Sequence, residues 1–181
     1  MLHKKEIAFR YDSSAEVYDT RYNDIQVHKY QEILSRVNIR QEDHLLDVGC
    51  GTGNFLGWNF SKENHSCFGV DISFEMIKKA HEKYPDIHFI VADADNLPFR
   101  DDCFDNIFSV THIQNMPEPF ITINEMARVA KDNSKLAISV LRKKWTIEKL
   151  STLIEESPYK KLDEWTAKIE DVGILCEKQV D

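Results

Sequence analysis

The sequence LLDVGCGTGN, residues 45–54, decides the fold of this chain. After an apolar first half, it has glycines at every other position: Gly49, Gly51 and Gly53. This pattern predicts a short buried strand that turns sharply into a helix beginning at Asn54. Because glycine has no Cβ, a ligand can lie directly against the backbone of such a turn, and the unpaired N–H groups of the helix would face that ligand. The stretch therefore predicts a binding site for a small molecule.

The spacing of these glycines indicates the class of ligand. Nicotinamide and flavin dinucleotides are bound by Gly-x-Gly-x-x-Gly, whereas this pattern is Gly-x-Gly-x-Gly with an acid two positions before it. The stretch resembles the first motif of class I S-adenosylmethionine (SAM)-dependent methyltransferases, hydrophobic-Asp/Glu-x-Gly-x-Gly-x-Gly. The resemblance implies that SAM is the cofactor and that the contacting residues here are Asp47, Gly49, Cys50, Gly51 and Gly53. A nicotinamide-dependent reductase on a similar fold is the rival that the spacing argues against.

A second acid follows the next apolar run at a spacing that suits a ribose. Residues 67–71, CFGVD, end in Asp71, eighteen positions after Gly53. In a strand–helix–strand unit, an acid about 20 residues after the glycine turn accepts hydrogen bonds from ribose hydroxyls. We therefore expect Asp71 and its neighbour Ile72 at the cofactor, and Ser73 as the N-cap of the next helix. A strand-end turn without a ligand is the alternative for Asp71.

Two further predicted strands end in polar turns. Residues 87–92 lead into Asp93 and Ala94, which resemble the segment where these methyltransferases hold adenine. The resemblance places the Asp93 carboxylate near the exocyclic amine and gives Ala94 a backbone contact. Residues 104–110 form the other strand, and Thr111 follows it. Because ligands of open α/β sheets lie outside the carboxyl ends of the strands, we expect both turns at the cofactor.

His112 is the best-placed candidate for a catalytic base, because it follows the fourth strand and imidazole titrates near neutral pH. A structural histidine with satisfied hydrogen bonds is the alternative. The sequence contains no Asn-Pro-Pro-Tyr type motif of the kind seen in relatives that methylate amides or exocyclic amines. This argues against DNA adenine and protein glutamine as acceptors.

The N-terminal segment, residues 9–22, is unusually aromatic. It resembles the lid that precedes the core in a subset of these enzymes, where tyrosines close over the cofactor. The resemblance makes Tyr11, Tyr18 and Arg21 candidate cofactor contacts. The alternative is an amphipathic helix whose tyrosines pack on the core.

The alternation of strands and helices predicts the fold class: an α/β, doubly wound, mainly parallel, Rossmann-like methyltransferase sheet. We expect one domain, residues 1–181, with a helical lid segment at 1–40, a cofactor-binding core at 41–141, and C-terminal helices with an edge strand at 142–181. The expected core strands are 44–49, 66–71, 87–92, 104–110 and 135–141. Residues 131–134 replace the Pro-Gly-Gly turn common in the family, which predicts an altered loop there.

The C-terminal end predicts an incomplete sheet. Residues 162–172 have the pattern of a helix, and residues 173–180 that of a terminal strand. The family sheet commonly has seven strands, and only six can be placed here, so we expect a truncated C-terminal strand pair. Either this edge is shortened or a second copy completes it, which would make the protein a homo-oligomer.

Composition narrows the function. A net charge of −8 argues against nucleic acid as the main partner, and neither a membrane span nor a secretory leader is evident, so we expect a cytoplasmic protein. Scattered cysteines and histidines predict no metal site. The chain is similar to the ubiquinone/menaquinone-biosynthesis-like group of methyltransferases, which implies methyl transfer from SAM to a small-molecule acceptor. A SAM-binding but inactive regulator or partner subunit is the alternative.

Overall fold

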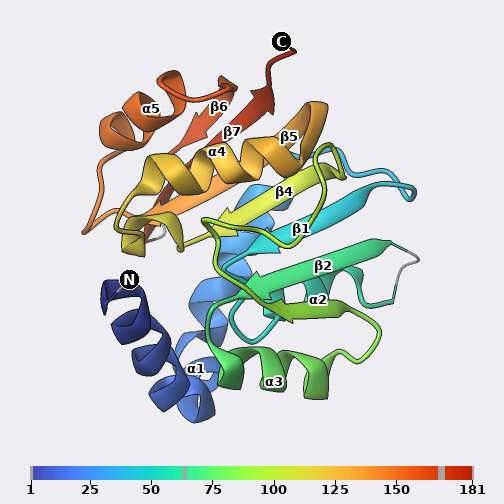
Figure 1. Ribbon diagram of the computed structural model, residues 1–181, viewed down its shortest axis with the longest axis vertical. Coiled ribbons are helices and arrows are strands. Elements are labelled where there is room, and N and C mark those ends of the chain that lie inside the picture. Colours follow the sequence, from blue (N-terminus) through green and yellow to red (C-terminus); the bar gives the residue numbers. More distant parts are fainter. Residues whose placement is uncertain (1, 63–64, 167–169, 181) are drawn as a thin grey trace.

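The computed structural model describes residues 2–62, 65–166 and 170–180, without the side chains of residues 2–3 and 21–24. Figure 1 shows an α/β fold in which helices cover a twisted central sheet. The elements follow in this order: α1 (Leu2–Leu34), β1 (His44–Val48), α2 (Asn54–Phe60), β2 (Ser66–Asp71), α3 (Phe74–Lys83), β3 (His88–Val91), β4 (Phe104–Val110), the 3₁₀ turn η1 (Ile113–Asn115), α4 (Pro119–Val129), β5 (Ala130–Leu141), α5 (Ile147–Glu155), β6 (Tyr159–Trp165) and β7 (Asp171–Lys178).

The sheet has seven strands in the order β3-β2-β1-β4-β5-β7-β6. The first five strands of the chain are parallel, and β7 lies antiparallel between β5 and β6. The order reverses between β1 and β4, and ligands of such sheets bind where it reverses. The five parallel strands confirm the predicted alternation.

Two apolar cores lie on opposite faces of the sheet. One joins α4 and α5 to β1 through Leu46 and Val48, and the other joins α1, α2 and α3 to the same strand through Leu45. Successive side chains of a strand point to opposite faces, so an uninterrupted apolar run serves both cores. The predicted doubly wound arrangement is confirmed, and it places the loops after the parallel strands together at one edge.

The predicted truncation of the C-terminal strand pair is wrong. Residues 162–165, expected to begin a helix, belong to β6, which pairs with β7 and completes the sheet; residues 167–169 of that expected helix lie outside the described part. Between Tyr159 and Trp165, which are buried, the strand is exposed and charged, so its sequence lacks an apolar alternation. The Trp165 indole covers Gly173 on the neighbouring strand, where a Cβ would lie 2.2 Å from the ring. This long-range contact, which no local pattern reveals, supports the strand.

The predicted turn at residues 131–134 lies inside β5. Ala130 pairs with Phe104 and Lys135 pairs with Asn106, so the four intervening residues form an irregularity in the ladder. Asn133 there has a φ of 60°, a left-handed conformation that asparagine tolerates. The chain therefore passes directly from α4 into β5.

Candidate functional site

The glycine loop has the sharp turn expected from its sequence. Gly49, Gly51 and Gly53 have φ values of 81°, 54° and 77°, and α2 begins at Asn54. The N–H groups of Gly49 and Cys50 donate to the carbonyl of Val70, at 2.8 and 3.0 Å. These bonds tie the loop after β1 to the end of β2.

A cleft with an empty volume of about 690 Å³ lies over this loop. Ten of the residues singled out in the sequence line it together: Tyr11, Tyr18, Gly49, Gly51, Asp71, Ile72, Asp93, Ala94, Thr111 and His112. They come from α1 and from the loops after β1, β2, β3 and β4. The structure thus brings most of the predicted site residues to one place, which we call the main cleft.

Four predicted site residues lie elsewhere. Asp47 and Cys50 line an adjoining cavity of about 350 Å³, which shares Gly49, Gly51 and Tyr18 with the main cleft. Gly53 lines neither; a Cβ there would lie 2.5 Å from the ring of Phe89, so this glycine allows close helix–sheet packing. The side chain of Arg21 lies outside the described residues.

The Asp71 carboxylate is held by backbone donors at the end of β2. It accepts N–H bonds from Gly51 at 3.0 Å and Ser73 at 2.9 Å, and the Ser73 hydroxyl accepts from the N–H of Met76 as the expected N-cap. Burial raises the pKa of Asp71 despite these bonds. The carboxylate is fixed at the cleft with lone pairs left for a ligand.

Asp47 is a buried acid in need of a partner. It is 2% exposed, and its Oδ1 accepts no hydrogen bond within the described chain. Burial, reinforced by the negative charge of Asp71, raises the pKa of Asp47 to about 8. A buried carboxyl without a donor is costly, so this atom suits a cationic or hydrogen-bonding ligand group.

At the end of β3, Asp93 is already paired with a cation that the sequence did not point to. Lys4 of α1 donates to Asp93 at 2.6 Å and also binds Asp95. Burial disfavours the charged form of each group, but the ion pairs together have the larger effect. They raise the pKa of Lys4 and lower the pKa of Asp93. Lys4 lies 89 positions before Asp93, and no local pattern announces the contact.

His112 follows β4 and lies against the glycine loop. A Cβ on Gly49 would be 2.3 Å from Cγ of the imidazole. The Nε2 atom is buried and has no hydrogen-bond partner in the described chain. Burial lowers the pKa of His112 to about 4, so the ring is neutral at pH 7.

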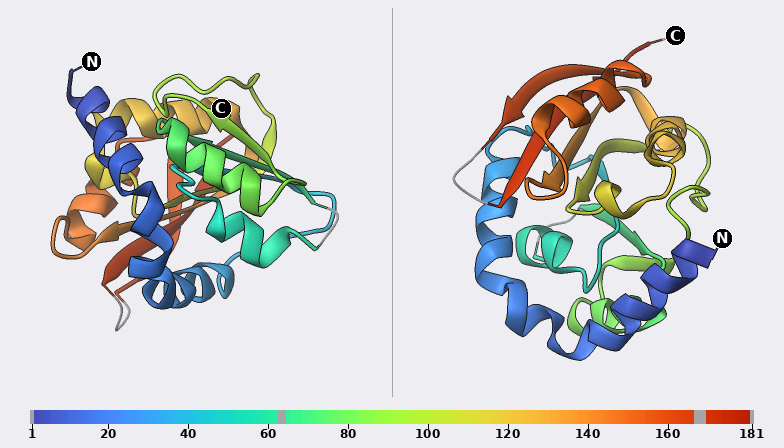
Figure 2. Two further views of the ribbon diagram at one scale, coloured as in Figure 1. Left: turned by 90° about the horizontal axis from the view of Figure 1, so that it is seen from below. Right: turned by 90° about the vertical axis from the view of Figure 1, so that its left-hand side faces the viewer.

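Helix α1 crosses the carboxyl edge of the parallel strands, and Figure 2 shows it curving around the molecule. Four polar side chains spaced along it reach successive strand ends: Lys4 reaches the β3 loop, Asp12 the Ser73 hydroxyl after β2, Asp19 the β1 loop and Lys29 the end of β4. Their order along the helix is the order of the strands in the sheet.

Asp19 and Lys29 fix the second half of α1 through both hydrogen bonds and ion pairs. Asp19 accepts from Thr52 Oγ1 at 2.6 Å and Asn54 Nδ2 at 2.9 Å, and it pairs with Lys83 at 2.6 Å. Lys29 is 2.8 Å from the buried Asp171, and it also donates to Thr111 at 3.1 Å. The helix therefore borders one side of the main cleft.

Two tyrosines of α1, Tyr11 and Tyr18, line this cleft. Tyr11 and Tyr18 meet edge to face, with ring centroids 6.3 Å apart. The Tyr11 hydroxyl accepts a bond of 3.3 Å from Asn115 Nδ2 in η1. Both residues also line the main cleft, so their contact with a cofactor stays a prediction.

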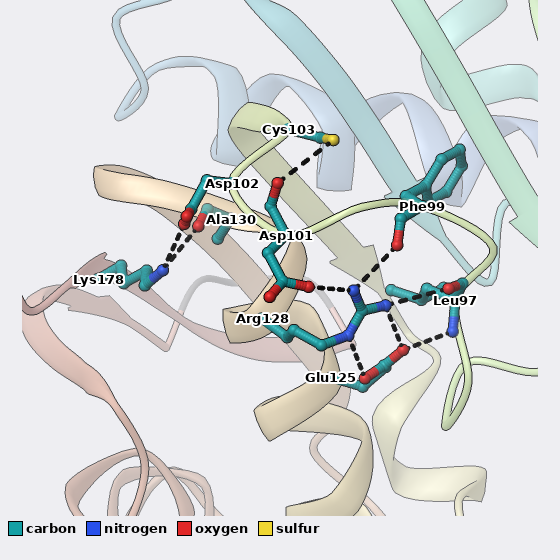
Figure 3. Close-up of polar contacts among 9 residues, drawn as sticks. All are labelled: Leu97, Phe99, Asp101, Asp102, Cys103, Glu125, Arg128, Ala130 and Lys178. Atoms are coloured by element: carbon teal, nitrogen blue, oxygen red, sulfur yellow. Dashed lines mark hydrogen bonds and ion pairs between the residues drawn. The ribbon is translucent and has the colours of Figure 1, made fainter.

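The loop that carries Asp93 is anchored at its far end by α4. Figure 3 shows the Arg128 guanidinium between the carbonyls of Leu97 and Phe99 and the carboxylates of Asp101 and Glu125. Glu125 in turn accepts from the Leu97 N–H at 2.7 Å. Such charge-assisted, partly buried bonds hold the segment after β3 in a fixed position.

The described residues contain neither a membrane-spanning helix nor a cluster of potential metal ligands. No helix among them has the length and apolar character needed to cross a membrane. Nor do they contain a group of three or more His, Cys, Asp or Glu side chains arranged to hold a metal ion.

Comparison with known proteins bears directly on this site. A family described as methyltransferase domain matches residues 46–138, about half of the chain, including the loops after β1 to β4. A malonyl-[acyl-carrier protein] O-methyltransferase of Marinomonas sp. is 32% identical, over 77% of this chain and 53% of its own length. A demethylmenaquinone methyltransferase of Paenarthrobacter aurescens is 33% identical, over 74% of this chain and 54% of its own.

The chain spans about half the length of these curated relatives. Among solved structures, magnesium protoporphyrin IX methyltransferase from Synechocystis, with bound SAM, superposes with a TM-score of 0.79 at 18% identity, covering 98% of this chain and 97% of its own. This likeness shows the fold. The family match together with the fold establishes that the chain belongs to the methyltransferase domain family, the class I SAM-dependent methyltransferases.

Proposed function

We propose that the protein binds SAM in the main cleft and transfers its methyl group to a small-molecule acceptor. The observation that carries the proposal is the open face of the glycine loop: a Cβ on Gly51 would meet nothing within 4 Å, although this residue lines the cleft. A backbone that faces open space between two acids, Asp71 and Asp93, suits a nucleoside.

The polar groups of the cleft suit the parts of SAM. Asp71 is held in position to accept the ribose hydroxyls, and Asp93 and the backbone of Ala94 are placed for adenine. Asp47, with its unpartnered oxygen in the adjoining cavity, suits the ammonium of the methionine part. When bound, SAM supplies a methyl group already activated by the sulfonium.

The residues of the cleft then serve mainly to position the reactants and exclude water. Tyr11 and Tyr18 cover the cleft from α1, and Thr111 borders it at the end of β4. His112 is a weak base, because burial keeps its pKa near 4. We infer that its Nε2 binds a polar group of a ligand and that the acceptor does not depend on it for deprotonation.

The class of acceptor rests on the relatives. Their names specify methylation of malonyl-[acyl-carrier protein], demethylmenaquinone and tocopherol. We propose a small molecule of this broad kind, and no nucleic acid, for this chain. We also propose a cytoplasmic location, because Cys50, Cys67 and Cys176 are buried in the core, as is usual for cysteines of proteins from reducing compartments.

A labelled-methyl assay tests the proposal. The purified protein is incubated with SAM carrying an isotopically labelled methyl group and a panel of small organic acids, phenols and quinols, and the products are analysed by mass spectrometry. We expect S-adenosylhomocysteine and one labelled acceptor in equal amounts. Tight SAM binding without transfer to any acceptor, also in extracts that contain the cell's metabolites, would indicate an inactive SAM-binding protein.

A further inference from the structure

A second cavity opens from the main cleft on the side of β5. It has an empty volume of about 600 Å³ and shares Tyr11, Tyr18, Thr111 and Asn115 with the main cleft. We call it the side cavity. Since the two spaces meet at the lid tyrosines and the end of β4, a molecule in the side cavity borders a ligand in the main cleft.

The mouth of the side cavity is basic in a chain of net charge −8. Lys143 and Lys144, which follow β5, line it, and Lys144 donates to Asn115 Oδ1 at 2.8 Å. Burial, together with the positive charges of Arg10 and Lys143, lowers the pKa of Lys144. Such clustered cations favour an anion beside them.

The acidic groups nearby do not cancel this charge. Lys29, the third lysine of the side cavity, is neutralised by its ion pair with Asp171. Among the described lining residues, Glu170 is the one carboxylate, so one negative charge stands beside the two positive charges of Lys143 and Lys144. The mouth therefore keeps an excess of positive charge.

Two residues that line the side cavity, Gln114 and Gln26, have buried oxygen acceptors without donors in the described chain. Gln114 Nε2 donates to the carbonyl of Thr111 at 2.6 Å, which fixes the amide so that Oε1 is an acceptor; that oxygen is buried and has no partner in the described chain. Gln26 of α1 is 9% exposed, and its Oε1 has no partner either. Buried polar atoms are normally hydrogen-bonded, so both oxygens point to a ligand with a donor.

We propose that the side cavity is the acceptor subsite and that it selects an anionic small molecule, a carboxylate or a phosphate, that also carries a hydroxyl or amine. The anion lies at Lys143 and Lys144, and the hydroxyl or amine donates to Gln114 or Gln26. This inference rests on the proposed function, since it makes the occupant of the side cavity the methyl acceptor.

Matched probes test it by calorimetry. The protein is saturated with S-adenosylhomocysteine and titrated with 3-hydroxybenzoate, with its uncharged methyl ester, with benzoate, which lacks the hydroxyl, and with 3-hydroxyphenyl phosphate. We expect both hydroxylated anions to bind at least tenfold more tightly than the ester, and 3-hydroxybenzoate several-fold more tightly than benzoate. The ratio of the carboxylate to the phosphate identifies the preferred anion.

Two double variants with the same change of charge localise the anion. Lys143→Gln/Lys144→Gln should weaken the binding of 3-hydroxybenzoate at least fivefold and leave the affinity for the ester unchanged. Lys160→Gln/Lys161→Gln, on the exposed face of β6, should change neither. In Gln114→Leu, whose folding is checked by thermal unfolding, the preference for 3-hydroxybenzoate over benzoate should disappear.

The outcomes separate this proposal from the one on which it rests. If S-adenosylhomocysteine binds but the ester binds as tightly as the acid, or if both double variants weaken the anion equally, the anionic subsite is refuted and the SAM site stands. If the anion selectivity is found but S-adenosylhomocysteine does not bind, the side cavity is an anion site and the methyltransferase proposal fails.

Discussion

At the residue scale, three glycines with the same left-handed backbone serve different purposes. The sequence predicted all three as ligand contacts because their spacing belongs to one motif. What lies beyond each Cα depends on distant residues: His112 at Gly49, open space at Gly51 and Phe89 at Gly53. Only the folded chain distinguishes Gly51, which faces open space, from Gly49 and Gly53, which lie against aromatic rings.

This difference gives a matched pair of variants. Gly51→Ala places a methyl group in the main cleft and should abolish measurable binding of S-adenosylhomocysteine, at a cost of about 1–2 kcal/mol in stability for the positive φ. Gly49→Ala carries the same backbone cost and a clash with the His112 ring, so its melting temperature should fall further. Unchanged affinity in folded Gly51→Ala would refute the placement of the ligand against this backbone.

Asp71 offers a second test at this scale. Asp71→Asn should weaken the binding of S-adenosylhomocysteine roughly ten- to a hundredfold, because a hydrogen bond to a charged group contributes about 1.5–3 kcal/mol. Asp86→Asn, an exposed position next to β3, is the control and should bind normally. Calorimetry on both variants decides; equal affinities would show that Asp71 is an ordinary turn residue.

Asp47 predicts a dependence of stability on pH. Its pKa is about 8 in the folded chain, against about 3.8 when exposed, so the folded state holds the proton more tightly. The resulting stability is complete below pH 4 and is lost as the pH rises to about 8. Asp47→Asn lacks this loss.

Urea unfolding of the ligand-free wild type and Asp47→Asn from pH 4 to pH 9 measures it. The variant should gain stability relative to the wild type up to about pH 8, after which the difference should level off. A difference that does not vary with pH would mean that Asp47 is ionised in the fold throughout.

At the scale of elements, α1 contacts the ends of β3, β2, β1 and β4 in turn, and its role as a lid stays a prediction. The aromatic residues of segment 9–22 predicted a lid. The polar contacts of α1 with the strand ends could not be predicted, because each joins positions far apart in sequence. The reverse holds for β6, whose charged segment has the local pattern of a helix and becomes a strand by pairing with β7. Local periodicity was sufficient for the buried parallel strands, where both faces are apolar.

The contacts of Asp19 predict that α1 slows the dissociation of a ligand from the main cleft. Asp19→Asn removes the charge that pairs with Lys83 and weakens the bonds to Thr52 and Asn54. S-adenosylhomocysteine should then dissociate several-fold faster, with faster amide exchange in α1. Glu16→Gln alters an exposed ion pair of the same helix, Lys79–Glu16, and should leave both rates unchanged, since exposed pairs contribute little. Equal effects of the two variants would contradict a specific role of the Asp19 contacts in holding α1 in place.

At the scale of the whole molecule, the segment that matches the family and the remaining segments form different cavities. Residues 46–138 contain the loops that form most of the main cleft. The lid and the lysines of the side cavity come from outside that range. This explains why the sequence indicated the cofactor well and the acceptor poorly, since the side cavity is assembled mostly from the two ends of the chain.

The completed sheet also changes the expectation of a homo-oligomer. That prediction rested on a missing edge strand, which β6 supplies. Lysines and acids on the exposed part of β6 are typical of edges protected from further pairing. A truncated sheet would also have favoured the alternative of an inactive SAM-binding protein, and the complete sheet removes that support.

The most direct test of the central claim, that the main cleft is a SAM site, is calorimetric titration of the wild-type protein with S-adenosylhomocysteine and, separately, with NADH. We predict one molecule of S-adenosylhomocysteine bound per chain and no binding of NADH. Binding of NADH without binding of S-adenosylhomocysteine would contradict the claim.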